Sequence, residues 1–97
     1  MDFKIEFRDT FIEDLESIVK RIAVHNPSAA RHLGETIIAT AESLSFFPER
    51  HPRLRHRLAI RRFIVKKHFK VFYRVLPQSR TVEILRCWDG HRRSDPL

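Results

Sequence analysis

The spacing of hydrophobic residues changes twice along this chain, and each change marks a boundary between predicted elements. Phe3, Ile5 and Phe7 alternate with charged residues, which is typical of a strand with one face against a core. From residue 10 to about residue 44 the apolar positions recur every three or four residues, which predicts helices. From Ala59 onward the strand-like alternation returns. The predicted order is one strand, two helices and then three strands.

Two helices are predicted between residues 9 and 45. At the start of the first, Thr10 and Glu13 stand at capping-box spacing. Asn26 then predicts the N-cap of the second helix, and Pro27 suits its first position, where the missing N–H costs nothing. Because the connection is so short, the two helices should form an antiparallel hairpin.

Three strands joined by short turns are predicted at residues 60–65, 68–76 and 81–88. Apolar residues fall on both faces of the middle strand, so both faces should be partly buried, one of them against the helices. The preceding residues 49–57 are basic and lack apolar periodicity, which predicts an exposed connection. Together these elements indicate an α+β fold of order β-α-α-β-β-β, with an N-terminal α-hairpin packed on one face of a small, mainly antiparallel four-stranded sheet.

Size and composition narrow the class of protein. With 97 residues, of which 42% are hydrophobic, we expect a single domain over residues 1–97. The chain has one cysteine, Cys87, no apolar run near the roughly 18 residues of a membrane helix, and no signal-peptide pattern at its start, which predicts a cytoplasmic protein without membrane association. Two glycines leave no phosphate-binding loop, and His51 and His56 lack acidic or thiol companions, so neither a cofactor nor a metal is expected.

Charge is distributed very unevenly. Residues 50–93 contain fourteen of the nineteen Lys and Arg residues against two acids, a net charge of +12, whereas residues 1–49 are mildly acidic. Because the bases alternate with apolar residues, they are expected on a sheet surface that suits phosphates or an acidic protein partner. The alternative is that they are the solvated side of an antiparallel sheet. The candidate binding residues are Arg62, Lys70, Arg74, Arg86, Trp88, Arg92 and Arg93.

The segment from residue 86 to residue 93 offers candidate chemistry. His91 suits proton transfer near neutral pH, and Lys70 and Arg92 could hold a scissile phosphate, as a metal-independent ribonuclease requires. The alternative is that Asp89 and Gly90 form an ordinary turn beside a surface histidine and a core tryptophan. Cys87 is expected to be a small buried hydrophobe and not a nucleophile.

The chain resembles the RelE/ParE family of bacterial type II toxins over nearly its whole length. The resemblance rests on a first strand running directly into an α-hairpin, then on residues 59–63, on residues 68–75, whose aromatic, basic and Tyr-x-Val order is the most specific part, and on residues 81–86 followed by 89–93. It implies a toxin neutralised by a cognate antitoxin, whose tail wraps the helical hairpin and the sheet. A basic sheet matches an acidic tail of this kind.

Two activities are implied by the resemblance. RelE-like members cleave mRNA on the ribosome with cations on the middle strands and an arginine after the fourth, which Lys70, Arg62 and Arg92 or Arg93 would match. The aromatic residue that often ends such chains is missing here, so His91 or His68 would have to transfer the proton. A slip of one residue in the second strand would exchange the roles of Arg61 and Arg62.

The ParE-like activity is favoured. The ending Gly-His-Arg-Arg-Ser-Asp-Pro at residues 90–96 is similar to the finish of members that poison DNA gyrase, which need a binding surface and no acid or base. In this interpretation Trp88, Arg92, Arg93 and the basic residues 50–57 are candidate contacts with the target. A third possibility is a member that has lost toxicity and only binds its antitoxin.

Overall fold

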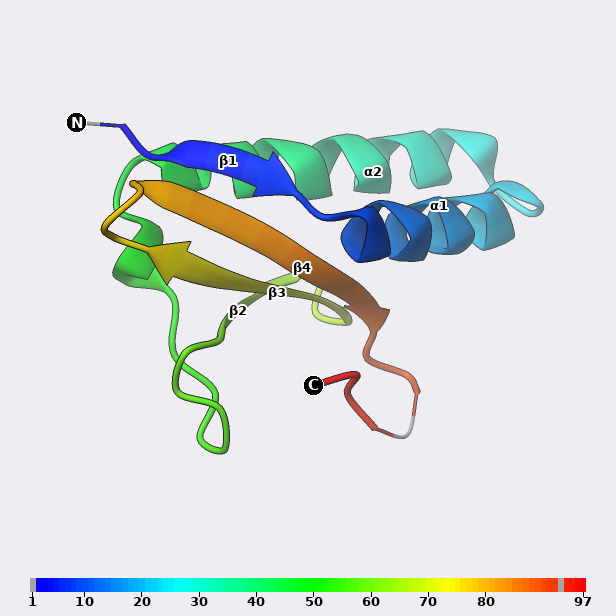
Figure 1. The fold of residues 1–97 in the computed structure, drawn as a ribbon. Helices are drawn as coiled ribbons and strands as arrows, with labels where there is room; N and C mark the ends of the chain where they lie inside the picture. Colours follow the sequence, from blue (N-terminus) through cyan, green and yellow to red (C-terminus); the bar gives the residue numbers. More distant parts are fainter. Residues whose placement is uncertain (1, 93) are drawn as a thin grey trace.

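A computed structural model describes residues 2–92 and 94–97 (Figure 1). One four-stranded sheet has the strand order β1-β4-β3-β2, with β1 parallel to β4 and the other pairs antiparallel. The helices α1 and α2 lie against one face of this sheet, and residues 54–60 and 94–97 lie on the opposite side, here called the outer face. The elements are β1 (Lys4–Phe7), α1 (Asp9–Ala23), α2 (Pro27–Glu42), two 3-10 turns (Ser43–Ser45 and Pro48–Arg50), β2 (Arg61–Val65), β3 (Phe69–Leu76) and β4 (Thr81–Asp89).

The predicted order of elements and the helical hairpin are confirmed, but one predicted cap is wrong. Asn26 caps α2, accepting a hydrogen bond from the Ala29 N–H at 3.1 Å, and Pro27 takes the first helical position. No capping box starts α1, because the helix begins two residues earlier than Thr10 as N-cap would require, with Arg8 as its N-cap. The Thr10 hydroxyl instead donates to the Leu85 carbonyl at 2.7 Å, which ties α1 to β4.

The main core fills the space between the helices and the sheet. Its largest buried side chain is Tyr73, whose hydroxyl donates to the Pro48 carbonyl at 2.7 Å. Burial raises the pKa of Tyr73 to about 12. The buried members of this core are Phe11, Ile18, Leu33, Ile37, Ala41, Leu44, Phe63, Val65, Val71, Tyr73, Val82, Ile84 and Cys87.

A second, smaller core lies on the outer face, as the two apolar faces of the middle strand predicted. Phe72 of β3 is fully buried there with Leu54 and Ile60. Leu54 belongs to the basic stretch that was predicted to be an exposed connection; that prediction is wrong at this residue, because its side chain closes the outer core. Leu85, Trp88 and Leu97 pack against the same cluster.

A β-bulge in β4 adjusts which side chains reach the outer face. Phe72 pairs with Arg86 and the next residue of β3, Tyr73, pairs with Ile84, so Leu85 is the extra residue. Leu85 packs in the outer core although the adjacent Ile84 lies in the main core. The bulge therefore sets the face on which Arg86 and the residues after it lie.

Candidate binding surface

The strand register brings cations from three strands to the outer face. Arg62, Phe72 and Arg86 form one cross-strand row, and Phe72 lies in the outer core. Lys70, opposite Trp88, and Arg74 alternate with Phe72 along β3 and share its face. Arg62, Lys70, Arg74, Arg86 and Trp88 therefore lie on one side of the sheet, and their role in binding stays a prediction.

The register of β2 also determines which of Arg61 and Arg62 lies on the outer face. Arg61 pairs with Tyr73, and its guanidinium donates to the carbonyls of Glu49 at 3.0 Å and His51 at 2.7 Å. Those bonds hold the connection before β2 in place. Arg62 is the residue of this pair that faces outward.

Lys70 and Arg62 share one carboxylate. The Lys70 Nζ lies 2.9 Å from Asp95 Oδ1, and the Arg62 Nη1 lies 3.9 Å from Asp95 Oδ2. All three side chains are partly buried, at 25%, 32% and 28% exposure for Lys70, Arg62 and Asp95. Two cations face one acid, so this group keeps a net positive charge.

Arg74 belongs to a second group of the same composition. The Glu83 carboxylate is buried and forms ion pairs with Arg74 and with Arg8, the latter at 2.6 Å. The two arginine side chains are about half exposed, at the rim of the sheet. Here too two cations surround one acid, which leaves one positive charge near the surface.

Arg86 is held more firmly than the other candidates. Its guanidinium donates to both carboxylate oxygens of Asp14 on α1, at 2.6 and 3.1 Å, and the Cys87 N–H donates to the same carboxylate at 3.1 Å. The hydrogen bond to Asp14 is the main cause of a raised Arg86 pKa. Because β1 pairs only with residues 81–84 of β4, Asp14 satisfies a backbone group on the edge that β1 leaves uncovered.

Trp88 and Arg92 form an aromatic and cationic unit at the end of β4. The Arg92 guanidinium carbon lies 4.7 Å from the indole centroid, and that of Arg86 lies 5.6 Å away. The indole N–H donates to the Ser94 carbonyl at 2.7 Å. Trp88 is therefore compatible with both interpretations of the sequence, as a core tryptophan and as a binding residue. Its side chain packs against the outer core, and part of its ring stays accessible to a partner. Arg93, a predicted contact, lies outside the described residues.

His91 lies in a tight turn with its ring held by a carboxylate. Its Nδ1 is 2.7 Å from Asp89 Oδ1, and Asp89 also pairs with Arg21 at 2.9 Å. Burial raises the pKa of Asp89, but the hydrogen bonds and charge of His91 and the charge of Arg21 outweigh it and hold the pKa below 3.8. The His91 ring stacks on His68 at 4.3 Å between centroids. The predicted turn at Gly90 is present, and its N–H donates to the His68 carbonyl at 2.6 Å.

The three residues predicted for catalysis are bound to different partners. Lys70 is paired with Asp95, Arg92 stacks on Trp88, and His91 is paired with Asp89. Of the three, His91 has an arrangement suited to acid–base chemistry, because the carboxylate orients its ring and leaves Nε2 as the nitrogen for proton transfer.

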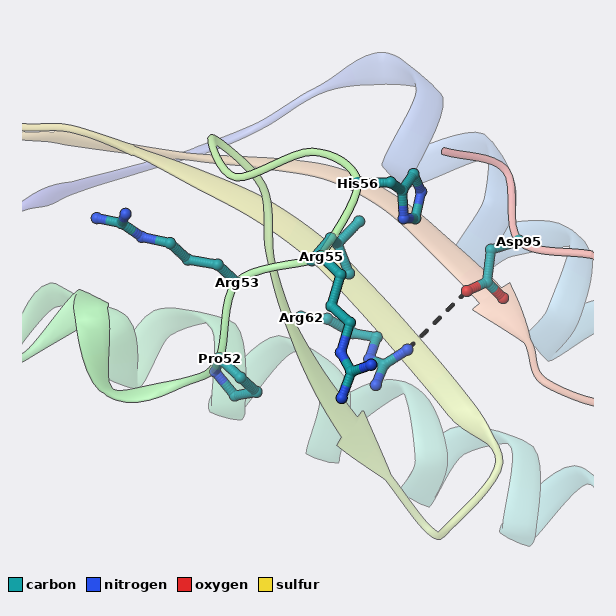
Figure 2. A pocket seen from close by; sticks show the side chains of 7 residues that line it. Pro52, Arg53, Arg55, His56, Arg62 and Asp95 are labelled. Atoms are coloured by element: carbon teal, nitrogen blue, oxygen red, sulfur yellow. Dashed lines mark ion pairs between the residues drawn. The ribbon is translucent and has the colours of Figure 1, made fainter.

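A cavity of about 390 Å³ opens on the outer face between residues 52–56, Arg62 and Asp95. Figure 2 shows the guanidinium groups of Arg55 and Arg62 directed into the same region, whereas Arg53 points away and Asp95 lies beside Arg62. Within the described part of the chain Arg55 has no ion pair. The cavity was not predicted, although Arg53 and Arg55 belong to the predicted basic connection and Arg62 was a predicted binding residue.

Several other sequence predictions concern groups away from this surface. Cys87 is buried, and burial raises its thiol pKa to about 12, which confirms a small buried side chain and leaves a protonated thiol at neutral pH. Among residues 2–92 and 94–97, His, Cys, Asp and Glu side chains do not gather in threes as a metal site needs. No helix in the same ranges is long and apolar enough to span a membrane.

Solved structures share this fold. The RelBE2 toxin–antitoxin complex of Mycobacterium tuberculosis matches with 23% identity over 98% of this chain and 95% of that one, at a TM-score of 0.69. The chromosomal ParDE system of Pseudomonas aeruginosa matches with 18% identity over 90% of this chain and 95% of that one, at a TM-score of 0.75. The isolated Escherichia coli RelE toxin matches with 12% identity over 96% of this chain and 88% of that one, at a TM-score of 0.58. The fold is therefore that of the RelE/ParE toxins.

The sequence narrows this class further. A family profile described as the ParE toxin of the type II toxin–antitoxin system parDE matches residues 5–94. No curated protein matches the chain. The chain belongs to the ParE toxin family, which confirms the resemblance found in the sequence and the preference for its ParE branch.

Proposed function

We propose that this toxin acts in the bacterial cytoplasm by binding DNA gyrase and stalling it on cleaved DNA. The observation that carries the proposal is the ParE family match over residues 5–94. It is supported by the site, because Lys70, His91 and Arg92 are each engaged by a different partner within the chain. A surface that acts by binding does not need a free acid or base among them.

The outer face has the properties that such binding requires. The groups around Asp95 and Glu83 each hold two cations for one acid, and Arg55 adds a further cation beside Arg62. Fields from clustered cations attract polyanions and raise association rates, so a gyrase–DNA complex would be drawn to this side of the molecule. Trp88 supplies a rigid aromatic anchor of the kind that often dominates interface energy.

We also propose that a cognate antitoxin covers two separate surfaces. A groove of about 410 Å³ between α1 and α2 is lined by Leu15, Gly34, Ile38 and Ala39, with acids at its rim. An amphipathic helix would bury its apolar side there. The outer face suits an acidic segment of the same partner, because it offers unpaired positive charge. Neutralisation would follow from covering the face that contacts the target.

Purified gyrase tests the proposed target. We expect the chain to inhibit supercoiling of relaxed plasmid and to leave linear DNA when the reaction is stopped with detergent and protease, since that treatment reveals trapped cleavage complexes. His91→Ala should retain both effects, because no proton transfer is involved. Full supercoiling with no linear DNA, at toxin concentrations well above those of gyrase, would contradict the proposal.

A ribosome-dependent endoribonuclease is the second candidate, favoured by the orientation of His91. The Asp89 carboxylate at 2.7 Å and the stacked His68 ring are an arrangement found around general acids and bases. In this case mRNA would be cut during translation in vitro, and His91→Gln or the double change of Lys70 and Arg92 to alanine would abolish cutting. Intact transcripts with the wild-type chain would exclude this activity.

A growth assay distinguishes a member that has lost toxicity from both a gyrase inhibitor and an endoribonuclease. Expression without antitoxin should stop growth of a bacterial host and induce DNA-damage signalling before protein synthesis falls. Unhindered growth with folded protein present would leave antitoxin binding as the remaining function.

A further inference from the structure

Residues 94–97 cross the outer face as a segment without regular secondary structure. Five contacts hold this segment, here called the strap. The Trp88 indole N–H donates to Ser94, Asp95 pairs with Lys70 and Arg62, the Leu97 side chain packs against the outer core, and His56 Nε2 lies 3.1 Å from the Leu97 carbonyl oxygen. The contacts come from β2, β3, β4 and the connection before β2. The strap therefore covers the centre of the cationic face.

Asp95 occupies the place of an external anion. Its carboxylate is within 2.9 Å of the Lys70 amine and partly shielded from water, so the pair is screened less than an exposed one. While this contact exists, it occupies one of the three N–H donors of the amine and offsets its charge, which weakens its attraction for a phosphate or carboxylate of a partner. The contact to Arg62, at 3.9 Å, is looser, and Arg55 beside it forms no ion pair within the described residues. The cavity thus holds one anionic group where the cations could accommodate more.

The strap is also weakly held. It has no place in the sheet, and among the described residues it is held by one indole hydrogen bond, one histidine contact, one side-chain ion pair, one longer charge contact and limited apolar packing. Partly exposed ion pairs contribute little individually. A partner with several anionic groups would therefore be able to replace Asp95.

We propose that the strap is an intramolecular competitor that must leave the outer face before an anionic partner can contact Lys70 and Arg62. Binding is then weakened by the fraction of molecules in which the strap is closed. This inference rests on the proposed role of the outer face in binding, but it does not depend on whether the target is gyrase, a ribosome or an antitoxin. Loss of the Asp95 charge should open the face without touching any cation.

The test uses the full chain and a short fluorescein-labelled DNA duplex as the anionic probe, with binding followed by anisotropy. Asp95→Asn is compared with Glu16→Gln, which removes one charge from an exposed position on α1 that has no ion pair or hydrogen-bond partner among the described side chains. Asp95→Lys, which Lys70 and Arg62 would repel, is compared with Glu16→Lys. Circular dichroism checks that all four variants are folded.

We expect Asp95→Asn to tighten probe binding about three- to tenfold, and Glu16→Gln to change it less than about twofold. Asp95→Lys should bind the probe more tightly than Glu16→Lys does, by at least the same factor. Equal effects at the two positions would overturn the proposal, because net charge alone would then explain them. Weaker binding by Asp95→Asn would also overturn it, since Asp95 would then belong to the binding surface.

Trp88 supplies a readout that does not need a binding partner. It is the only tryptophan of the chain, and its indole N–H bonds to the strap. Release of the strap should shift its emission in Asp95→Asn and Asp95→Lys but not in the Glu16 variants, and the probe should produce the same shift in the wild type. If neither the wild type nor any variant binds the probe, the proposed role of the outer face in binding is wrong. The emission shift in the Asp95 variants would still show that Asp95 holds the strap closed. Unchanged emission in both Asp95 variants would overturn the strap itself.

Discussion

Replacing Asp14 by alanine is predicted to destabilise the fold more than any change at the exposed acids of α1. The Asp14 carboxylate accepts two hydrogen bonds from Arg86 and one from the Cys87 N–H. Alanine would leave that N–H without its partner at an uncovered sheet edge and leave Arg86 without its counter-charge. The tether between α1 and β4 at this point would be lost.

The size of the effect follows from these three bonds. Hydrogen bonds to charged groups contribute about 1.5 to 3 kcal/mol when buried, and partial exposure of the pair reduces this, so we expect a total loss of about 2 to 3 kcal/mol. For a domain of this length that corresponds to a fall in Tm of about 8 to 24 °C. Asp14→Asn keeps an acceptor for the backbone and should lose about half as much.

Urea unfolding followed by Trp88 fluorescence and circular dichroism measures the loss. The midpoint should fall without a change in slope, since the denatured state is not altered. Arg86→Met should be less than additive with Asp14→Ala, because the two residues share the interaction. Glu16→Ala is the control and should stay within about 0.5 kcal/mol of the wild type. An Asp14→Ala variant as stable as Glu16→Ala would refute the assigned role of this carboxylate.

Three further changes test other parts of the structure. Gly90→Ala would place a Cβ 2.5 Å from the His68 carbonyl oxygen, so a loss of about 1 to 3 kcal/mol is expected in urea unfolding, and an unchanged midpoint would contradict the turn geometry. Phe47 is 79% exposed with φ at 54°, so Phe47→Gly should raise stability by up to about 1 kcal/mol in a thermal scan, and a lower Tm would oppose this. Asp89 has a folded pKa below its ordinary 3.8, so it stabilises above that value and loses this contribution as pH falls through the folded pKa. Asp89→Asn should therefore be less stable than wild type at neutral pH and similar to it near about pH 2, and a gap that is constant with pH would be the contrary result.

The arrangement of elements could be predicted because burial acts on residues that are close in sequence. Alternation in the strands and the 3.6-residue period in the helices record which side of each element is buried. Asn26 and Pro27 act locally, and their prediction was confirmed in detail. The two-sided pattern of β3 likewise anticipated a second core, although not that Leu54 would help to close it.

The partners of the cations could not be predicted, because they come from distant parts of the chain. Asp14 lies 72 positions from Arg86, and Asp95 lies 25 positions from Lys70. Periodicity does not record such pairs, and the bulge at Leu85 changed the register that would be needed to infer them. Thr10 failed as a cap for a related reason, since its hydroxyl bonds to a strand 75 residues away. The sequence therefore predicted where the positive charges lie but not which acids form ion pairs with them.

We propose that the outer face, through Lys70 and Arg62, is the surface with which this toxin engages its target. The direct measurement is trapping of gyrase cleavage complexes by the Arg62→Ala/Lys70→Ala double variant, with Lys20→Ala/Arg31→Ala as a control that removes two exposed cations from the helices. We expect the outer-face variant to fold and to lose at least about tenfold in trapping, as the loss of roughly 1.4 kcal/mol of binding would produce, while the helix variant traps as the wild type does. Equal trapping by all three proteins would contradict the claim.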